Sequence, residues 1–133
     1  MATWVRVIIG IFVQLVSWIA IALTLFIAVQ TAWPAFAEAN ATFNATQVVL
    51  FDQPMMITRL VLAGIASILA AWIAGLTLRD NRIVPVVGGL VLLALFIPNH
   101  IQLWDKFPIW YHLTFLTSLP VLAIIGGRLA PAE

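Results

Sequence analysis

The sequence has no cysteine and very little charge. Without cysteine, the chain cannot form a disulfide, use a thiolate nucleophile or bind a metal through sulfur. Charged residues make up 8% of the chain, whereas soluble domains usually carry about 25%. Six basic residues stand against five acidic ones, and the net charge of +1 comes without a basic block. These deficits exclude a nucleic-acid-binding surface and argue against a water-soluble fold.

Apolar residues predominate in the sequence and form four long runs. They account for 64% of the 133 residues, and the mean hydropathy is +1.13. A run of about 20 apolar residues matches the roughly 30 Å hydrocarbon core of a bilayer. We predict an all-α membrane protein, a four-helix transmembrane bundle with one longer outer-side loop between its first two helices. The predicted spans of this single integral membrane domain, residues 1–133, are residues 4–29, 57–78, 83–97 and 108–127.

Two prolines set predicted span boundaries, and one motif offers a second interpretation. Pro98 is expected to end the third span, and Pro108 to begin the fourth. Residues 35–37, Ala-Phe-Ala, have the small-residue pattern of a signal-peptidase site. The apolar run before them is about 22 to 25 residues long, however, against roughly 7 to 15 in a signal peptide. We therefore expect the first run to be an uncleaved helix.

The basic residues predict the orientation in the membrane. With both termini in the cytoplasm, more basic residues lie inside than outside, as the positive-inside rule favours. The inside set is Arg6, Arg79, Arg82 and Arg128, and the outside set is Arg59 and Lys106. We expect the inner membrane of a bacterium, with the long connection 30–56 on the outer face. Residues 46–51 within it are β-formers, so the connection is expected to hold a short strand or an interfacial helix.

The densest group of polar residues follows the third span. The candidates for catalytic chemistry are His100, Asp105, Tyr111 and His112, and the two histidines are the candidate metal ligands. The histidines are twelve positions apart with Pro108 between them, so we do not expect them on one helical face. The alternative role is structural, because an outer loop needs polar residues and aromatic residues anchor at the interface. No metal-ligand spacing recurs, and we expect no cofactor.

Arg59 lies near the start of the second span, where two roles are open. Its side chain can extend to the lipid headgroups, or it can pair with Asp52 or Asp105 as an outer gate. No Asp, Glu, Lys or His lies in the middle of a predicted span. That pattern argues against an ion pump or proton-coupled transporter built from this chain alone.

Small residues repeat along the second span. They are Ala63, Ser67, Ala71, Ala74 and Gly75. Small residues three or four positions apart let helix backbones approach closely. Glycine pairs at 88–89 and 126–127 offer similar surfaces on the third and fourth spans. We predict that the second span lies at the centre of the bundle or at a contact with another subunit.

The sequence favours a non-catalytic function. We expect an accessory or assembly subunit, or a small homo-oligomeric membrane component. Its partners would be the lipid bilayer and other membrane subunits, or further copies of itself. The first alternative is an outer-leaflet enzyme that binds a metal, haem or quinone through His100 and His112. The second is a small oligomeric transporter of a neutral or hydrophobic solute.

Overall fold

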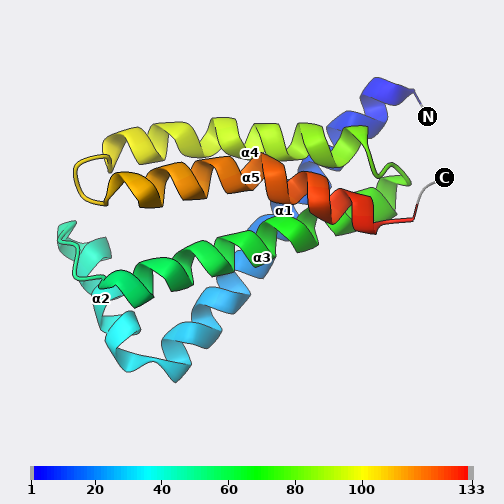
Figure 1. Ribbon diagram of the computed structural model, residues 1–133. Coiled ribbons are helices and arrows are strands. Elements are labelled where there is room, and N and C mark those ends of the chain that lie inside the picture. Colours follow the sequence, from blue (N-terminus) through cyan, green and yellow to red (C-terminus); the bar gives the residue numbers. More distant parts are fainter. Residues whose placement is uncertain (1, 132–133) are drawn as a thin grey trace.

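The computed structural model describes residues 2–131, and they form an all-helical fold (Figure 1). The helices are α1 (Thr3–Ala32), α2 (Pro34–Thr46), α3 (Gln53–Leu78), α4 (Ile83–Gln102) and α5 (Ile109–Leu129). Four of them, α1, α3, α4 and α5, are long and apolar enough to cross a membrane. The predicted four-helix membrane bundle is therefore confirmed.

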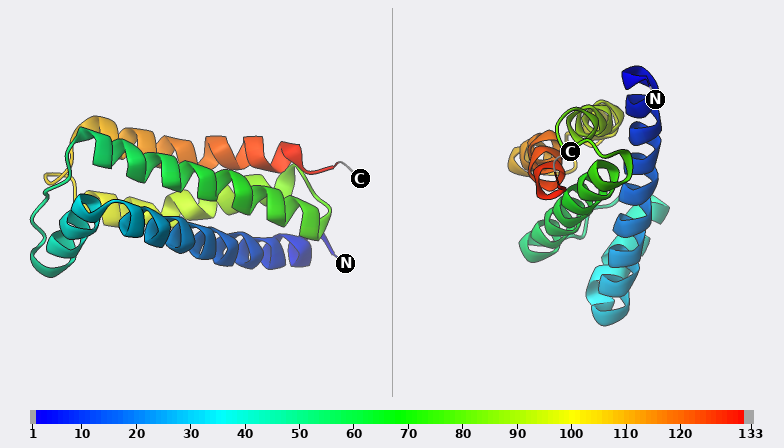
Figure 2. Two further views of the ribbon diagram at one scale, coloured as in Figure 1. Left: turned by 90° about the horizontal axis from the view of Figure 1, so that it is seen from below. Right: turned by 90° about the vertical axis from the view of Figure 1, so that its right-hand side faces the viewer.

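The four long helices run side by side, with α3 in contact with α1 and α5 and more lightly with α4 (Figure 2). Helix α4 packs mainly on α5 and also contacts α1. The N-terminal start of α1 and the C-terminal end of α5 lie at one end of the bundle, which we call the terminal end. Helix α2 lies at the opposite end, which we call the cap end.

A side-chain cap begins α3, and a left-handed residue ends it before the turn into α4. Asp52 precedes α3, and its Oδ1 accepts a hydrogen bond from the backbone N–H of Met55 at 2.9 Å. Arg79 adopts the left-handed conformation with φ 55°, which ends α3. Asp80 Oδ1 then accepts from the N–H groups of Arg82 and Ile83 at 2.9 and 2.8 Å. The resulting turn is short, so α3 and α4 form an antiparallel hairpin.

The prediction that Pro98 ends the third span is wrong. Helix α4 continues through Pro98 to Gln102, five residues beyond the predicted boundary at Ile97. A proline inside a helix removes a single N–H and frees one carbonyl, here that of Ala94. Near the end of a helix packed along α5, that loss does not stop the helix.

The long connection contains a helix rather than a strand. Helix α2 extends to Thr46, and Gln47 ends it in the left-handed conformation with φ 62°. Residues 47–52 have no regular structure, and no strand occurs anywhere in residues 2–131. The β-forming run at 46–51 has no second strand to pair with, so its propensity is not realised.

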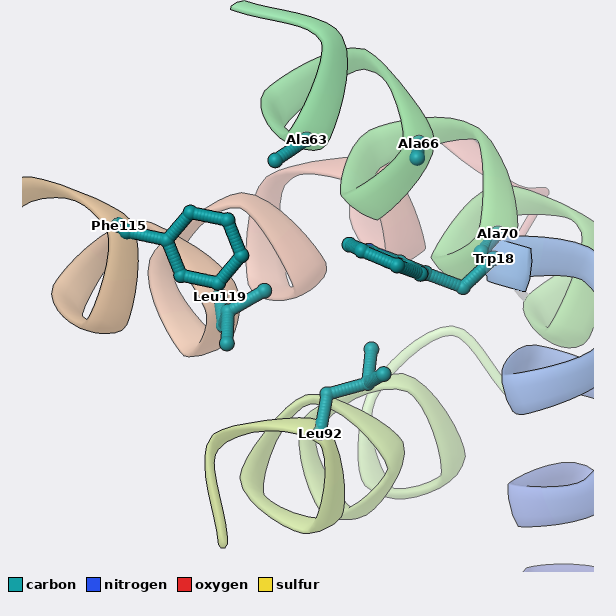
Figure 3. Packing of buried hydrophobic residues seen from close by; sticks show 7 residues of the cluster. All are labelled: Trp18, Ala63, Ala66, Ala70, Leu92, Phe115 and Leu119. Carbon is teal, nitrogen blue, oxygen red and sulfur yellow. The ribbon is translucent and has the colours of Figure 1, made fainter. Parts of the chain in front are cut away.

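The core lies where the four long helices meet. Figure 3 shows the central cluster, formed by Trp18, Ala63, Ala66, Ala70, Leu92, Phe115 and Leu119. Trp18 donates its indole N–H to the Ser67 hydroxyl at 3.0 Å, and that hydroxyl donates to the carbonyl of Ala63 at 2.8 Å. The small residues of α3 named above are all buried: Ala63, Ser67, Ala71, Ala74 and Gly75. Helix α3 packs mainly against α1 and α5 within this chain.

Two glycines allow unusually close contacts between helices. A methyl group at Gly126 of α5 would overlap the backbone carbonyl of Ile68 in α3. A methyl group at Gly88 of α4 would overlap the side-chain amide of Gln14 in α1. Gln14 is fully buried, and its Nε2 donates to the carbonyl of Pro85 at 3.2 Å. These contacts hold α1 and α5 against their neighbours toward the terminal end.

Candidate functional site

The cap end of the bundle is closed by packed aromatic rings. Five of them form what we call the aromatic cap: Phe36, Phe43, Phe51, Phe107 and Tyr111. The first two come from α2, the third precedes α3, and the last two belong to the α4–α5 turn and the start of α5. Phe51 stacks on Phe107 with ring centroids 6.2 Å apart, and Phe107 stacks on Tyr111 at 4.7 Å. The cap therefore joins three segments that are distant in the sequence.

Arg59 lies against the inner side of the aromatic cap. Its guanidinium carbon lies 4.7 Å from the ring centroid of Phe51, within cation–π range. Its Nε–H donates to the Tyr111 hydroxyl at 3.1 Å. Asp52 and Asp105 are both exposed, and no carboxylate in residues 2–131 lies within ion-pair distance of Arg59. The half-buried cation is therefore held by aromatic rings and a hydroxyl rather than by an opposite charge.

An apolar cleft extends from Arg59 toward the centre of the bundle. Its volume is about 170 Å³. Residues of all four long helices line it: Trp18, Ala22, Phe26, Arg59, Leu62, Ala63, Phe96, Tyr111 and Phe115. Most of these side chains are aromatic or aliphatic. The exceptions are the Arg59 guanidinium and the Tyr111 hydroxyl that it contacts. The cleft thus has one cationic end and an apolar body.

The two histidines of the chain meet beside this cleft. Because α4 reaches Gln102, His100 lies in its last turn, and His112 lies in the first turn of α5. Both side chains are buried, and their Nδ1 atoms are 2.7 Å apart. The His100 ring also packs on Phe115 at 4.6 Å and on Tyr111 at 6.1 Å between centroids. The histidine pair thus lies directly behind two residues of the cleft wall.

The hydrogen bonds of the pair select one tautomer for each ring. His112 Nε2 lies 3.3 Å from the carbonyl oxygen of Trp104, which can only accept, so this nitrogen carries the proton. The Nδ1 of a neutral His112 is then an acceptor, and the proton between the rings belongs to His100 Nδ1. His100 Nε2 is left with a lone pair and has no hydrogen-bond partner in residues 2–131. The pair therefore ends in one unprotonated nitrogen.

The structure brings together three of the four residues proposed for chemistry. His100, Tyr111 and His112 lie side by side, whereas Asp105 is exposed on the α4–α5 turn. In residues 2–131, no three or more His, Asp or Glu side chains are grouped so that they can hold a metal ion. The two candidate metal ligands instead direct nitrogens at each other.

Sequence reasoning missed the cleft, and the alternative that pairs Arg59 with Asp52 or Asp105 is wrong. The available signal was a single arginine within an apolar span, which by itself indicates a functional position. Its partner, Tyr111, lies 52 positions away in the sequence, within the polar group that follows the third span. Trp18 carried no signal for a role in the cleft, because its contact with Ser67 depends on how α1 crosses α3.

No protein-family model, curated protein or solved structure matches this chain.

Proposed function

We propose that the chain is a non-catalytic integral membrane component that binds one amphipathic molecule in the cleft. The headgroup of the molecule, anionic or hydrogen-bond-accepting, contacts Arg59 and Tyr111. Its apolar part lies against Trp18, Phe96 and Phe115. The observation that carries this proposal is a cation at one end of an apolar cleft, with no carboxylate partner among residues 2–131.

The surroundings of Arg59 favour an acceptor headgroup. A charged side chain at membrane depth is costly unless it is paired or reaches water. Here the Nε–H of Arg59 bonds to Tyr111, while the other guanidinium N–H groups have no protein acceptor in residues 2–131. A carboxylate or carbonyl oxygen can accept from these donors, and guanidinium binds such groups through its planar donor geometry.

The position of the cleft supports entry from the bilayer. The aromatic cap closes its water-facing end with the buried rings of Phe36, Phe51 and Phe107. Helices α1 and α4 touch through Trp18 and Phe96, whose ring centroids are 5.1 Å apart. On the cap side of that contact, α1 contributes Ala22 and Phe26 to the cleft wall. We propose that a molecule dissolved in the hydrocarbon enters the cleft on this side, without crossing water.

Fluorescence quenching tests the proposal. Trp18 lines the cleft, so a fatty acid brominated in mid-chain should quench it on binding. The signal of Trp18 is the difference between the wild-type protein and Trp18→Phe in the same detergent. We expect saturable quenching of this difference signal, weakened at least tenfold in apparent affinity by Arg59→Gln, since a charge-assisted hydrogen bond contributes about 1.5–3 kcal/mol.

Two controls separate specific binding from partition into detergent. Arg6→Gln changes a cation at the terminal end and should leave the quenching unchanged. The methyl ester of the same brominated fatty acid lacks the charge and should bind more weakly. Non-saturable quenching, or identical curves for wild type and Arg59→Gln, would contradict the proposal.

The proposed setting is the inner membrane of a bacterium, with both termini in the cytoplasm and the cap end outside. The excess of basic residues at the terminal end supports this orientation. A partner subunit is supported by α1, the least enclosed of the four spans. Phe12, Val16 and Leu23 on α1 are more than half exposed. Cross-linking through a cysteine at Val16 should join the chain to a specific protein or a second copy, and lipid-only labelling would exclude this part of the proposal.

A further inference from the structure

We infer that the cleft binds a carboxylic acid, which ionises on binding. Its carboxylate lies at Arg59, and its proton moves to the His100–His112 pair. This inference rests on the proposed function and names the ligand class. The step is a proton transfer in which RCOOH and neutral His100 become RCOO⁻ and protonated His100. It breaks one O–H bond, forms one N–H bond and needs no further reactant.

The histidine pair can accept one additional proton. Among the described residues, 2–131, only His100 Nε2 of the four histidine nitrogens lacks a hydrogen-bond partner. A proton added there leaves the other contacts intact, because His100 still donates from Nδ1 to His112 and His112 still donates to Trp104. A second proton would make both Nδ1 atoms donors at 2.7 Å and would break the pair. The capacity of the pair is therefore one.

The charges around the pair make protonation of His100 depend on whether an anionic ligand is bound. Helix α3 contributes Arg59, and α5 contributes Tyr111, whose hydroxyl accepts from Arg59. Asp105 and Lys106 in the α4–α5 turn are exposed, as are Glu38 of α2 and Asp52 before α3. Without a bound anion, a proton on His100 places a second positive charge near Arg59, because both side chains contact Tyr111.

A bound carboxylate removes this repulsion between protonated His100 and Arg59. It neutralises Arg59, so that a proton on the pair no longer meets an uncompensated cation. Binding of the anion and binding of the proton then favour each other by the same factor, as linkage requires. The site therefore selects weak-acid amphiphiles over permanently neutral ones, and it can take them from the hydrocarbon in the uncharged form.

Isothermal titration calorimetry with a fixed-charge probe tests the inference. A long-chain alkylsulfonate cannot be protonated near neutral pH, so any proton uptake on binding belongs to the protein. Titrations in buffers with different ionisation enthalpies give the number of protons taken up per bound sulfonate. We expect a value between zero and one that rises toward one as the pH is lowered from 8 to 5. The affinity should increase by up to about tenfold per pH unit, the limit for one coupled proton.

Two further measurements assign the proton to the histidine pair. His100→Phe should still bind the sulfonate through Arg59 but take up no proton. If this variant does not fold, nitrogen NMR of histidine-labelled wild-type protein replaces it, because protonation of His100 Nε2 shifts that resonance on sulfonate addition. Binding that depends on Arg59 without proton uptake would overturn this inference and leave the proposed function standing. Absence of sulfonate binding would overturn both.

Discussion

The Nδ1 atoms of His100 and His112 lie 2.7 Å apart, although the two residues are twelve positions apart and on different helices. The contact exists because α4 continues past Pro98 and α5 begins at Ile109, so that the two helix ends face each other. One ring must donate and the other must accept. The pair is therefore both a link between the helices and a defined arrangement of protons.

A double-mutant cycle on the histidine pair should show strong coupling. Each single substitution, His100→Phe or His112→Phe, leaves the other imidazole buried without its partner, at a cost of about 1–3 kcal/mol. The double variant should be less destabilised than the sum of the two, with an interaction energy of about 0.5–3 kcal/mol. Unfolding of the detergent-solubilised protein by a denaturing detergent measures these free energies. Additive effects would show that the bond contributes nothing to stability.

Gly126→Ala should destabilise the bundle, whereas Gly64→Ala should not. The added methyl group at Gly126 meets the backbone carbonyl of Ile68, which cannot move without shifting α3 against α5. Such overpacking typically costs about 1–3 kcal/mol. At Gly64 the nearest atom is the flexible end of Leu122 at 3.2 Å, and alanine favours the helix over glycine by about 1 kcal/mol. Equal unfolding free energies for the two variants would contradict the packing described here.

Trp18→Phe should weaken the contact between α1 and α3. It keeps an aromatic ring but removes the N–H that bonds to Ser67, a loss of about 0.5–1.5 kcal/mol. Trp72→Phe is the matched control, because Trp72 is 38% exposed and should change the unfolding free energy by less than about 0.5 kcal/mol. Ser67→Ala added to Trp18→Phe should cost little more, since it removes only the local bond from Ser67 to the Ala63 carbonyl within α3. A larger effect for Trp72 than for Trp18 would place the core elsewhere.

Phe51→Ala should loosen the aromatic cap while the four long helices persist. Phe51 contacts Phe36, Phe43 and Phe107, and it lies over the guanidinium of Arg59. Its removal should speed amide hydrogen exchange in residues 34–52 and leave exchange in α3 beyond Ala63 nearly unchanged. Uniform acceleration along the whole chain would mean that the cap is part of the same cooperative unit as the bundle.

The sequence predicted four long apolar helices because bilayer thickness constrains them strongly. Four apolar runs could only become helices of membrane length, since every backbone polar group must be bonded in the hydrocarbon. The end of α4 was not predicted, because a helix packed along a neighbour tolerates the single lost hydrogen bond at Pro98.

The site was only partly predictable, since it depends on contacts between helices. The sequence singled out His100, Tyr111 and His112 as polar residues at one end of the bundle. It gave no sign that the histidines face each other, because that requires both helix ends to be known. The contact of Phe51 with Arg59 was equally unpredictable from the sequence, because Phe51 lies in the irregular segment that leads into α3.

Native mass spectrometry of the protein released directly from membranes tests most directly whether the Arg59 end of the cleft holds a headgroup. We predict one amphipathic molecule per chain on the wild-type protein and on Arg6→Gln, and its loss from Arg59→Gln at equal helical content. A wild-type chain that carries no bound molecule, or an Arg59→Gln chain that retains it, would contradict the account.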